Sequence, residues 1–261
     1  MPTSGDAKVT SAYLAYPFVR SRSANLYGQL AYDGKRLVDS SLVNSVLFGA
    51  ADVQKKLNSV TWALTGDGQD RLLRGGRTRY GIAITAGDLK IQSASARADD
   101  DANLRTDGSF SKAYVNVERD QRLGETWTVH VSASAQESNK NLDGSEEFPL
   151  AGPHGVRAYA QGYLGGDRGY LATVELRKTF DKAQWLQLVA FFDHGGVRID
   201  RDPLPSNDDN NRTLNGGGFG FTAALPNNFA LRFHHAWRFN ADELAKREAH
   251  HQTWFQAVKY F

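Results

Sequence analysis

The feature that most constrains the fold is a period-two alternation of apolar and polar side chains that recurs along the chain. Its clearest example places Phe229, Leu231, Phe233, His235, Trp237 and Phe239 in alternation with Ala230, Arg232, His234, Ala236, Arg238 and Asn240. Side chains of a β-strand point to opposite faces in turn, so one face of this segment is mostly apolar and the other is polar or cationic. We expect Leu231, Phe233, Trp237 and Phe239 to face lipid, and Arg232 and Arg238 to face away from it.

Extended along the chain, the same pattern predicts about twelve strands. They are expected near residues 8–20, 23–33, 51–66, 77–91, 109–120, 125–137, 144–150, 169–180, 184–195, 213–225, 228–240 and 250–261. Several have about 10 residues or more, the length that a tilted strand needs to cross a bilayer, whereas strands of soluble sheets average five or six. Short connections such as 226–228 also alternate with long polar ones such as 196–212. The sequence therefore predicts an all-β fold, a transmembrane antiparallel β-barrel.

Composition excludes several other classes of protein. The chain has 261 residues with 31 Lys and Arg against 29 Asp and Glu, a net charge of +2 that is too balanced for a nucleic-acid-binding domain. It has no cysteine, which excludes disulfides, thiolate metal sites and cysteine nucleophiles. No run of about 18 apolar residues is present. The mean hydropathy of −0.50 is compatible with a membrane barrel, because only every second residue of a barrel strand faces lipid.

The most specific motif lies in the long polar stretch between residues 145 and 169. It begins with SEEFPLAGPHGVRAY and ends in GGDRG. The candidate site residues in it are Gly152, Gly155, Val156, Arg157, Tyr159, Gly165, Asp167 and Gly169. A second motif follows at Phe191, Phe192 and Asp193. The chain ends in Phe261 on an amphipathic segment, which resembles the C-terminal signature of bacterial outer-membrane proteins, although Lys259 stands where an aromatic is commoner.

Together these motifs resemble the sixth loop and the barrel wall of two-partner secretion (TpsB-type) outer-membrane transporters, the hemolysin activator family. The superfamily form of the loop motif is Val-Arg-Gly-Tyr, and Ala158 replaces its glycine. The resemblance implies that the loop folds into the lumen and that its arginine pairs with the wall aspartate, which here are Arg157 and Asp193, with Phe191 in the wall motif. The alternative is that Arg157 is a solvated loop charge and Asp193 merely starts a turn.

The resemblance also implies how the chain relates to a whole transporter. The family fold is a sixteen-strand barrel preceded by a signal peptide, a plug helix and two POTRA domains. Residues 1–261 would form the C-terminal portion of that barrel, without signal peptide or POTRA domains. We then expect Met1 to be an internal start, a fragment boundary or a truncated gene model.

The function implied is an outer-membrane pore that secretes a large hemolysin-type or adhesin-type exoprotein. Its partners would be that exoprotein, outer-membrane lipid and the outer-membrane assembly machinery, with no nucleic acid. We expect no enzymatic activity and no cofactor, since the sequence carries no ATP-binding or metal-binding motif. Two alternatives remain: an assembly factor of the same superfamily, and a twelve-strand outer-membrane esterase or phospholipase with a Ser-His pair, such as His130 and Ser132, on the outer wall.

Two segments leave questions open. The connection from Ser93 to Ser109 is unusually long for the short-turn side of the barrel, so either a strand is misassigned near it or that turn is elaborated. The glycine-rich run from Gly216 to Gly220 predicts a lumen face with room for a plug.

Overall fold

The computed structural model describes residues 3–41, 53–180, 183–204, 209–239 and 250–259. Phe261, the predicted C-terminal signature, lies outside the described residues. Eleven strands form one antiparallel sheet in the order β1-β2-β3-β4-β5-β6-β9-β10-β11-β12-β13. Their bounds are β1 (Thr3–Arg20), β2 (Ala24–Ser41), β3 (Val53–Asp70), β4 (Gly76–Ile91), β5 (Gly108–Arg122), β6 (Trp127–Ser138), β9 (Arg168–Phe180), β10 (Ala183–Arg198), β11 (Asn211–Leu225), β12 (Phe229–Arg238) and β13 (His251–Lys259).

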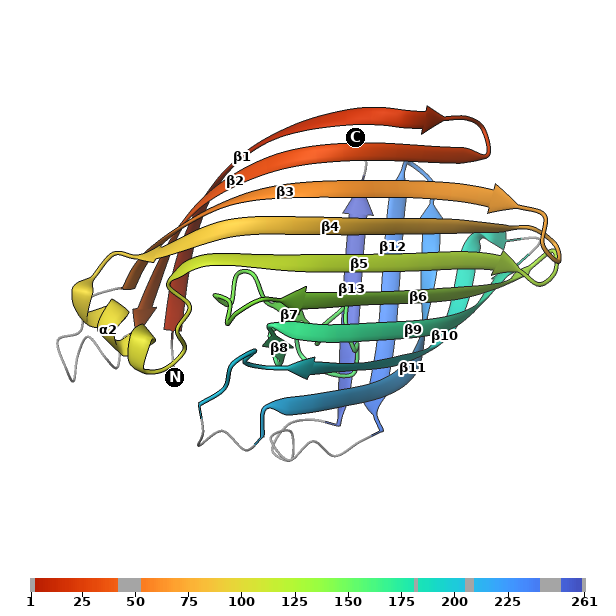
Figure 1. The fold of residues 1–261 in the computed structure, drawn as a ribbon. Coiled ribbons are helices and arrows are strands. Elements are labelled where there is room, and N and C mark those ends of the chain that lie inside the picture. Colours follow the sequence, from red (N-terminus) through yellow and green to blue (C-terminus); the bar gives the residue numbers. More distant parts are fainter. Residues whose placement is uncertain (1–2, 42–52, 181–182, 205–208, 240–249, 260–261) are drawn as a thin grey trace.

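The sheet curves around an interior, with β1 and β13 as its two edges (Figure 1). Long connections leave one end of the strands, and short turns such as 21–23, 71–75 and 123–126 leave the other. We call these the loop end and the turn end. The expected all-β fold of outer-membrane barrel type is confirmed, with a sheet that is open between β1 and β13 within the described residues.

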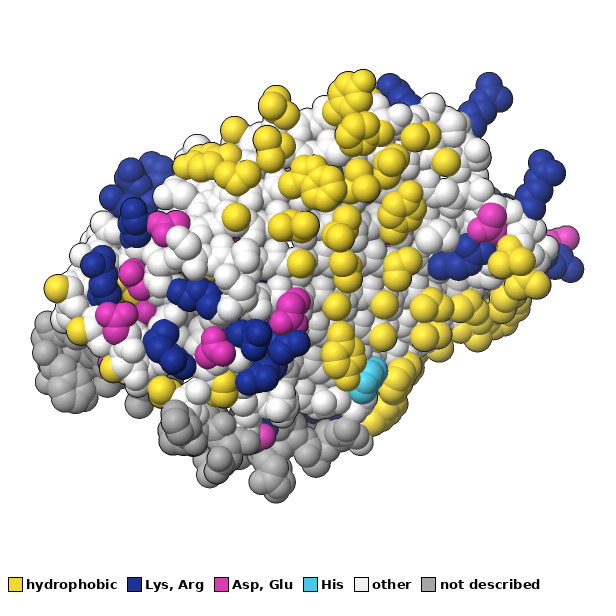
Figure 2. All heavy atoms as spheres, viewed as in Figure 1, with side chains coloured by type: hydrophobic (Ala, Val, Ile, Leu, Met, Phe, Trp, Pro, Cys, Tyr) yellow, Lys and Arg dark blue, Asp and Glu magenta, His cyan; other side chains and the backbone are white. Residues whose placement is uncertain are grey.

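The period-two pattern determines which side of the sheet each side chain occupies. Trp237 and Phe239 are exposed on the outer face, whereas Arg238 donates a hydrogen bond to the loop inside the sheet. In β10, Leu188 and Phe192 are exposed and Asp193 is fully buried. Figure 2 shows the consequence on one outer face, where hydrophobic side chains form a broad field over the middle of the strands. The predicted register of β10 and β12 is thus confirmed.

One predicted strand is absent from the wall, and its absence answers the question of the 93–109 connection. Within residues 144–150 only β7 (Phe148–Pro149) is a strand, and it pairs with β8 (Gly165–Gly166) in a separate two-stranded ladder. The alternating burial of Phe148 and Leu150 is real, but these side chains pack against the interior of the sheet instead of forming part of it. Without this strand, the wall has eleven described strands instead of about twelve, and the 93–109 connection falls at the loop end.

That connection contains the helix α2 (Ala94–Ala102), which begins after Ser93, whose side chain accepts a hydrogen bond from the backbone N–H of Ala96. No helix among the described residues is long and apolar enough to cross a membrane.

Candidate functional site: a loop held inside the barrel wall

Residues 139–167 form a loop that leaves β6 at the loop end, folds across the inner face of the sheet and returns to β9 (Figure 1). Its apolar side chains join those of the wall in one buried cluster. The loop contributes Phe148, Leu150, Ala151, Val156, Ala158 and Tyr159, and the wall contributes Val189, Phe191, Val197, Leu214 and Ala236. The loop is therefore packed into the interior as a second layer.

A tight turn directs the tip of the loop toward the wall. The N–H of Val156 donates to the carbonyl of Leu150 at 2.7 Å, and the N–H of Gly155 donates to the carbonyl of Gly152 at 3.0 Å. Gly152 has a φ of +113°, a conformation that side chains disfavour. A Cβ on Gly155 would lie 2.2 Å from the Leu150 carbonyl oxygen. Both motif glycines are thus required by the backbone that presents Arg157.

Arg157 is fixed by four hydrogen bonds to two wall carboxylates. Its Nε and Nη2 donate to the two oxygens of Asp193 at 2.9 and 2.7 Å, and its backbone N–H donates to Asp193 Oδ2 at 3.1 Å. Its Nη1 donates to Glu175 Oε1 at 2.7 Å. The guanidinium also lies 3.5 Å from the ring centroid of Phe191. Bidentate pairing of this kind combines charge with fixed geometry, and both side chains of the Arg157–Asp193 pair are buried.

Further wall residues hold the same tip, and no motif in the sequence identifies them. Thr173 Oγ1 donates to Asp193 at 2.9 Å, and Arg177 pairs with Glu175. Trp254 Nε1 on β13 donates to the carbonyl of Arg157 at 2.8 Å. Thr173, Glu175 and Arg177 alternate with apolar residues along β9, so a period-two reading of this strand could have marked them as an inward polar row.

The substitution of Ala158 for the family glycine has a counterpart in the wall. Ala158 is completely buried. Gly216 of β11 lies against it, since a Cβ on Gly216 would come within 2.5 Å of the Ala158 Cβ. The expectation that the glycine-rich run makes room for a plug is confirmed at Gly216. Tyr159, also completely buried, lies next to Ala158 with the guanidinium of Arg238 at 4.4 Å from its ring centroid.

Asp167 lies where the loop returns to the wall. It joins the start of the loop to the segment between β10 and β11. Its carboxylate accepts hydrogen bonds from the backbone N–H groups of Leu142 at 2.9 Å and Arg201 at 2.7 Å. Burial raises the pKa of Asp167 to about 6, with Asp200 adding to the increase and the two N–H donors opposing it.

The remaining motif glycines lie near Asp167 in the chain. A Cβ on Gly169 would come within 2.6 Å of the Phe148 ring, and one on Gly165 within 2.9 Å of Glu147 Oε2.

The start of the loop has a separate anchor, which no motif in the sequence indicates. Glu146 forms ion pairs with Lys35 of β2 and with Lys112 of β5, the latter at 2.9 Å, and Asp143 pairs with Lys55 of β3 at 2.8 Å. Lys112 also donates to the carbonyl of Glu146 at 2.7 Å. We call Lys35, Lys55 and Lys112 with their two carboxylates the lysine clamp. It ties the loop to the part of the wall that the Arg157 anchor does not touch.

Beneath the tip lies a polar cavity of about 300 Å³ whose lining includes Arg157, Arg177, Arg232, His130 and Ser132. The suggestion that His130 and Ser132 lie on the outer wall is wrong, because they occupy the inner row of β6, opposite to Val131. His130 Nδ1 is 2.8 Å from Asp120 Oδ1. Among the described residues, no three His, Cys, Asp or Glu side chains are grouped so that they could hold a metal ion.

The comparison with known families decides the class of this chain. The family model of the haemolysin secretion/activation protein ShlB/FhaC/HecB matches residues 52–223. The chain belongs to this family. It is a TpsB-type protein of the bacterial outer membrane, as its motifs and its sheet both indicate.

Individual relatives agree with this assignment. The heme/hemopexin transporter protein HuxB of Haemophilus influenzae is 22% identical over 265 residues, covering 100% of this chain and 45% of HuxB. The chain thus spans about half the length of the curated relatives it matches. CdiB from Escherichia coli has a similar structure, with a TM-score of 0.77, 18% identity and coverage of 98% of this chain and 45% of CdiB. BamA from Haemophilus ducreyi, solved without POTRA domains 1–3, has a TM-score of 0.50, 14% identity and coverage of 97% of this chain and 61% of BamA.

Proposed function

We propose that this chain forms the wall and the gating loop of a two-partner secretion pore, which exports a large exoprotein of hemolysin or adhesin type across the outer membrane. Family membership supports transport, and the observation that carries the gating role is the buried bidentate pair of Arg157 and Asp193. An extended polypeptide needs a hydrated path along the inner face of the barrel. The loop lies across that face, so its anchors set whether the path is open.

The polar inner face supports the same role. The cavity below the tip is lined by cationic, anionic and hydroxyl side chains, which can exchange hydrogen bonds with a passing backbone. The Arg157 tip closes one side of this cavity. A loop that stays anchored keeps the pore closed to other solutes, and a loop that is released in a controlled way opens it.

The test uses the full-length protein, expressed with its genomic partner exoprotein in a strain from which the chromosomal copy is deleted. Without its anchor the loop is no longer held in one position or released in a controlled way. We therefore expect Arg157→Ala to reduce export at least tenfold while the barrel still assembles, as judged by heat-modifiable migration. Arg71→Ala, in the exposed turn between β3 and β4, is the matched control and should export at the wild-type level. Wild-type export by Arg157→Ala would overturn the gating role.

The same strain separates this function from that of an assembly factor. Deletion of a secretion pore removes one exoprotein from the medium and leaves the levels of unrelated outer-membrane barrels unchanged. A general fall in those barrels on deletion would instead support the assembly factor.

A further inference from the structure

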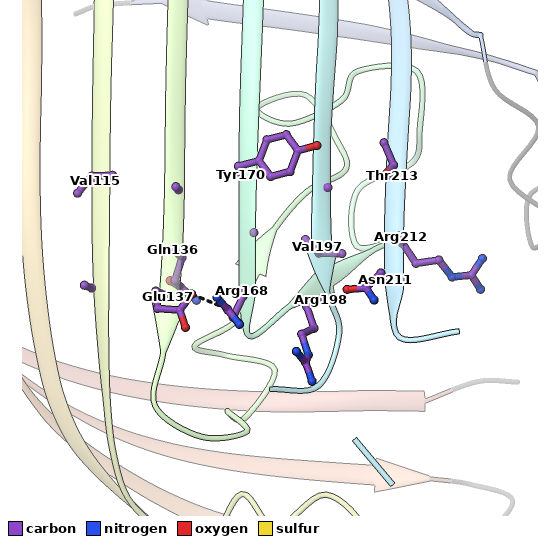
Figure 3. Close-up of a pocket in the computed structure, with 14 residues that line it drawn as sticks. Val115, Gln136, Glu137, Arg168, Tyr170, Val197, Arg198, Asn211, Arg212 and Thr213 are labelled. Atoms are coloured by element: carbon purple, nitrogen blue, oxygen red, sulfur yellow. Dashed lines mark hydrogen bonds and ion pairs between the residues drawn. The ribbon is translucent and has the colours of Figure 1, made fainter. Parts of the chain in front are cut away.

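A groove of about 480 Å³ crosses the outer face of β5, β6, β9, β10 and β11 at the loop end. Figure 3 shows it with Val115 on β5, Tyr170 on β9, and Arg168 and Arg198 at one end. The floor of the groove includes Ala113, Ala135 and Gly196, whose small size leaves the space open. Val115 and Tyr170 beside it are 44% and 46% exposed, so the groove opens outward and its length is apolar.

The charged end of the groove contains two arginines in direct cross-strand opposition. Arg168 of β9 pairs in register with Arg198 of β10, and both side chains lie on the outer row that includes Tyr170. Like charges directly opposite each other destabilise a sheet. Glu137 pairs with Arg168 and lies 3.7 Å from Arg201, so two guanidinium groups share one carboxylate. Arg198 donates to the backbone carbonyl of Asp200 and has no carboxylate partner among the ion pairs of the described residues. This end of the groove therefore carries excess positive charge.

The position of the groove limits what can occupy it. In outer-membrane barrels the long loops lie outside the cell and the short turns face the periplasm. The groove therefore starts where the hydrophobic field of the outer face meets the external surface. In Figure 2, charged side chains gather over the loop end of the strands, beside that hydrophobic field. A ligand here meets apolar surface along its length and two arginines at its head.

We propose that this groove binds a phosphorylated lipid of the outer leaflet, with a phosphate between Arg168 and Arg198 and an acyl chain along the apolar floor. Arginine matches phosphate geometry through two parallel N–H donors, and a bridging anion offsets the repulsion between the pair. Glycine at 196 keeps the floor open, since even a Cβ there would lie 3.0 Å from the Tyr170 ring. This site is independent of whether the pore secretes an exoprotein.

The test measures lipid binding to the purified full-length protein in detergent by native mass spectrometry. The probes are lipid A, which is a phosphorylated acyl glycolipid, and phosphatidylcholine, with inorganic phosphate as a competitor. We expect the wild type to retain lipid A at least tenfold more strongly than phosphatidylcholine, and the double variant Arg168→Ala/Arg198→Ala to lose that preference. The matched control is Arg22→Ala/Arg71→Ala, which removes the same charge at the turn end and should bind as the wild type does.

A second variant tests the acyl part of the site. Ala135→Trp fills the floor and leaves both arginines in place, so lipid A binding should fall at least fivefold. Heat-modifiable migration of each variant shows that the barrel is assembled. Lipid A binding that is unchanged in Arg168→Ala/Arg198→Ala would overturn the proposal, and so would complete displacement of lipid A by inorganic phosphate, which would indicate an anion site without an acyl component. Stoichiometric dimers that compete with lipid A would show instead that a second copy of the chain covers the groove.

Discussion

The two anchors of the interior loop differ in the way they hold it. At the tip, one guanidinium is enclosed by Asp193, Glu175 and the Phe191 ring, and its side chain is only 6% exposed. In the lysine clamp, flexible side chains such as Lys35 and Lys112 are 20% and 16% exposed and share one carboxylate. A planar, buried guanidinium that forms a bidentate pair has one geometry. A lysine can keep its ion pair in many side-chain conformations. We infer that the tip is a two-state lock and that the clamp is an adjustable tether.

The anchors also differ in the part of the wall that they use. The carboxylates that bind Arg157 lie on β9 and β10, and the lysines of the clamp lie on β2, β3 and β5. The loop thus spans the interior from one part of the curved sheet to another. Release of the tip alone would leave the loop tethered at its start, so that it can return to the closed position.

The largest expected effect is that of Arg157→Ala. Removing one partner of a buried ion pair costs about 3–5 kcal/mol. Asp193 is left as a buried charge without its arginine, whereas Glu175 keeps its ion pair with Arg177. We expect amide hydrogen exchange of residues 150–159 to accelerate more than a hundredfold, with exchange in β10 almost unchanged. Arg71→Ala is the control. If protection at the tip survives Arg157→Ala, the lock is not what holds the loop.

A smaller effect is expected from Gly216→Ala, which inserts a methyl group against Ala158. Overpacking of this kind costs roughly 1–3 kcal/mol. The second substitution Ala158→Gly removes the opposing methyl group and should restore most of the lost protection at the tip. Additive losses in the double variant, measured by the same hydrogen exchange, would mean that the two residues do not share one contact.

Glu146→Gln should weaken the clamp by about 1.5 kcal/mol, because a charged hydrogen bond is replaced by a neutral one. The backbone bond from Lys112 to the Glu146 carbonyl remains. We therefore expect faster exchange at residues 142–147 and no change at residues 155–159. Glu125→Gln, in the exposed turn before β6, is the control. An equal loss at both ends of the loop would contradict the separation of the two anchors.

The smallest effect is a pH dependence confined to the loop start. Burial raises the pKa of Glu147 to about 7 from its ordinary 4.5, with Asp167, Asp143 and Asp200 adding to the increase. Because this pKa is raised, the folded loop prefers the protonated carboxyl, and stability is lost as the pH rises through about 7. After correction for intrinsic rates, exchange near residue 147 should slow from pH 8 to pH 6. Glu147→Gln should remove this dependence, and its persistence would assign it to another group.

Much of the wall could be predicted from the sequence, because alternation that continues along strands as long as β10 and β12 places one face of each strand outward and the other inward. The same rule failed at residues 144–150, since Phe148 and Leu150 alternate toward a core that lies inside the barrel. Alternation reports a buried face without saying what buries it. The wall strands and the inner loop therefore produce the same local pattern.

The candidate site could be predicted from the sequence only in part. Arg157 and Asp193 could be predicted from motifs, but Glu175 requires the register that sets it opposite Phe191. The lysine clamp requires more, since Lys35 and Glu146 are separated by 111 positions. Nothing local to either residue distinguishes it from a solvated charge. Such contacts follow from the curvature of the whole sheet.

The central claim, that Arg157 and Asp193 form one lock, is tested most directly by a double-mutant cycle on export by the full-length protein. Arg157→Ala, Asp193→Ala and the double variant are compared with the wild type in the same strain, with barrel assembly monitored in each. A shared interaction predicts a double variant no worse than the more defective single variant. Export defects that multiply in the double variant would show that the two residues act separately and would contradict the lock.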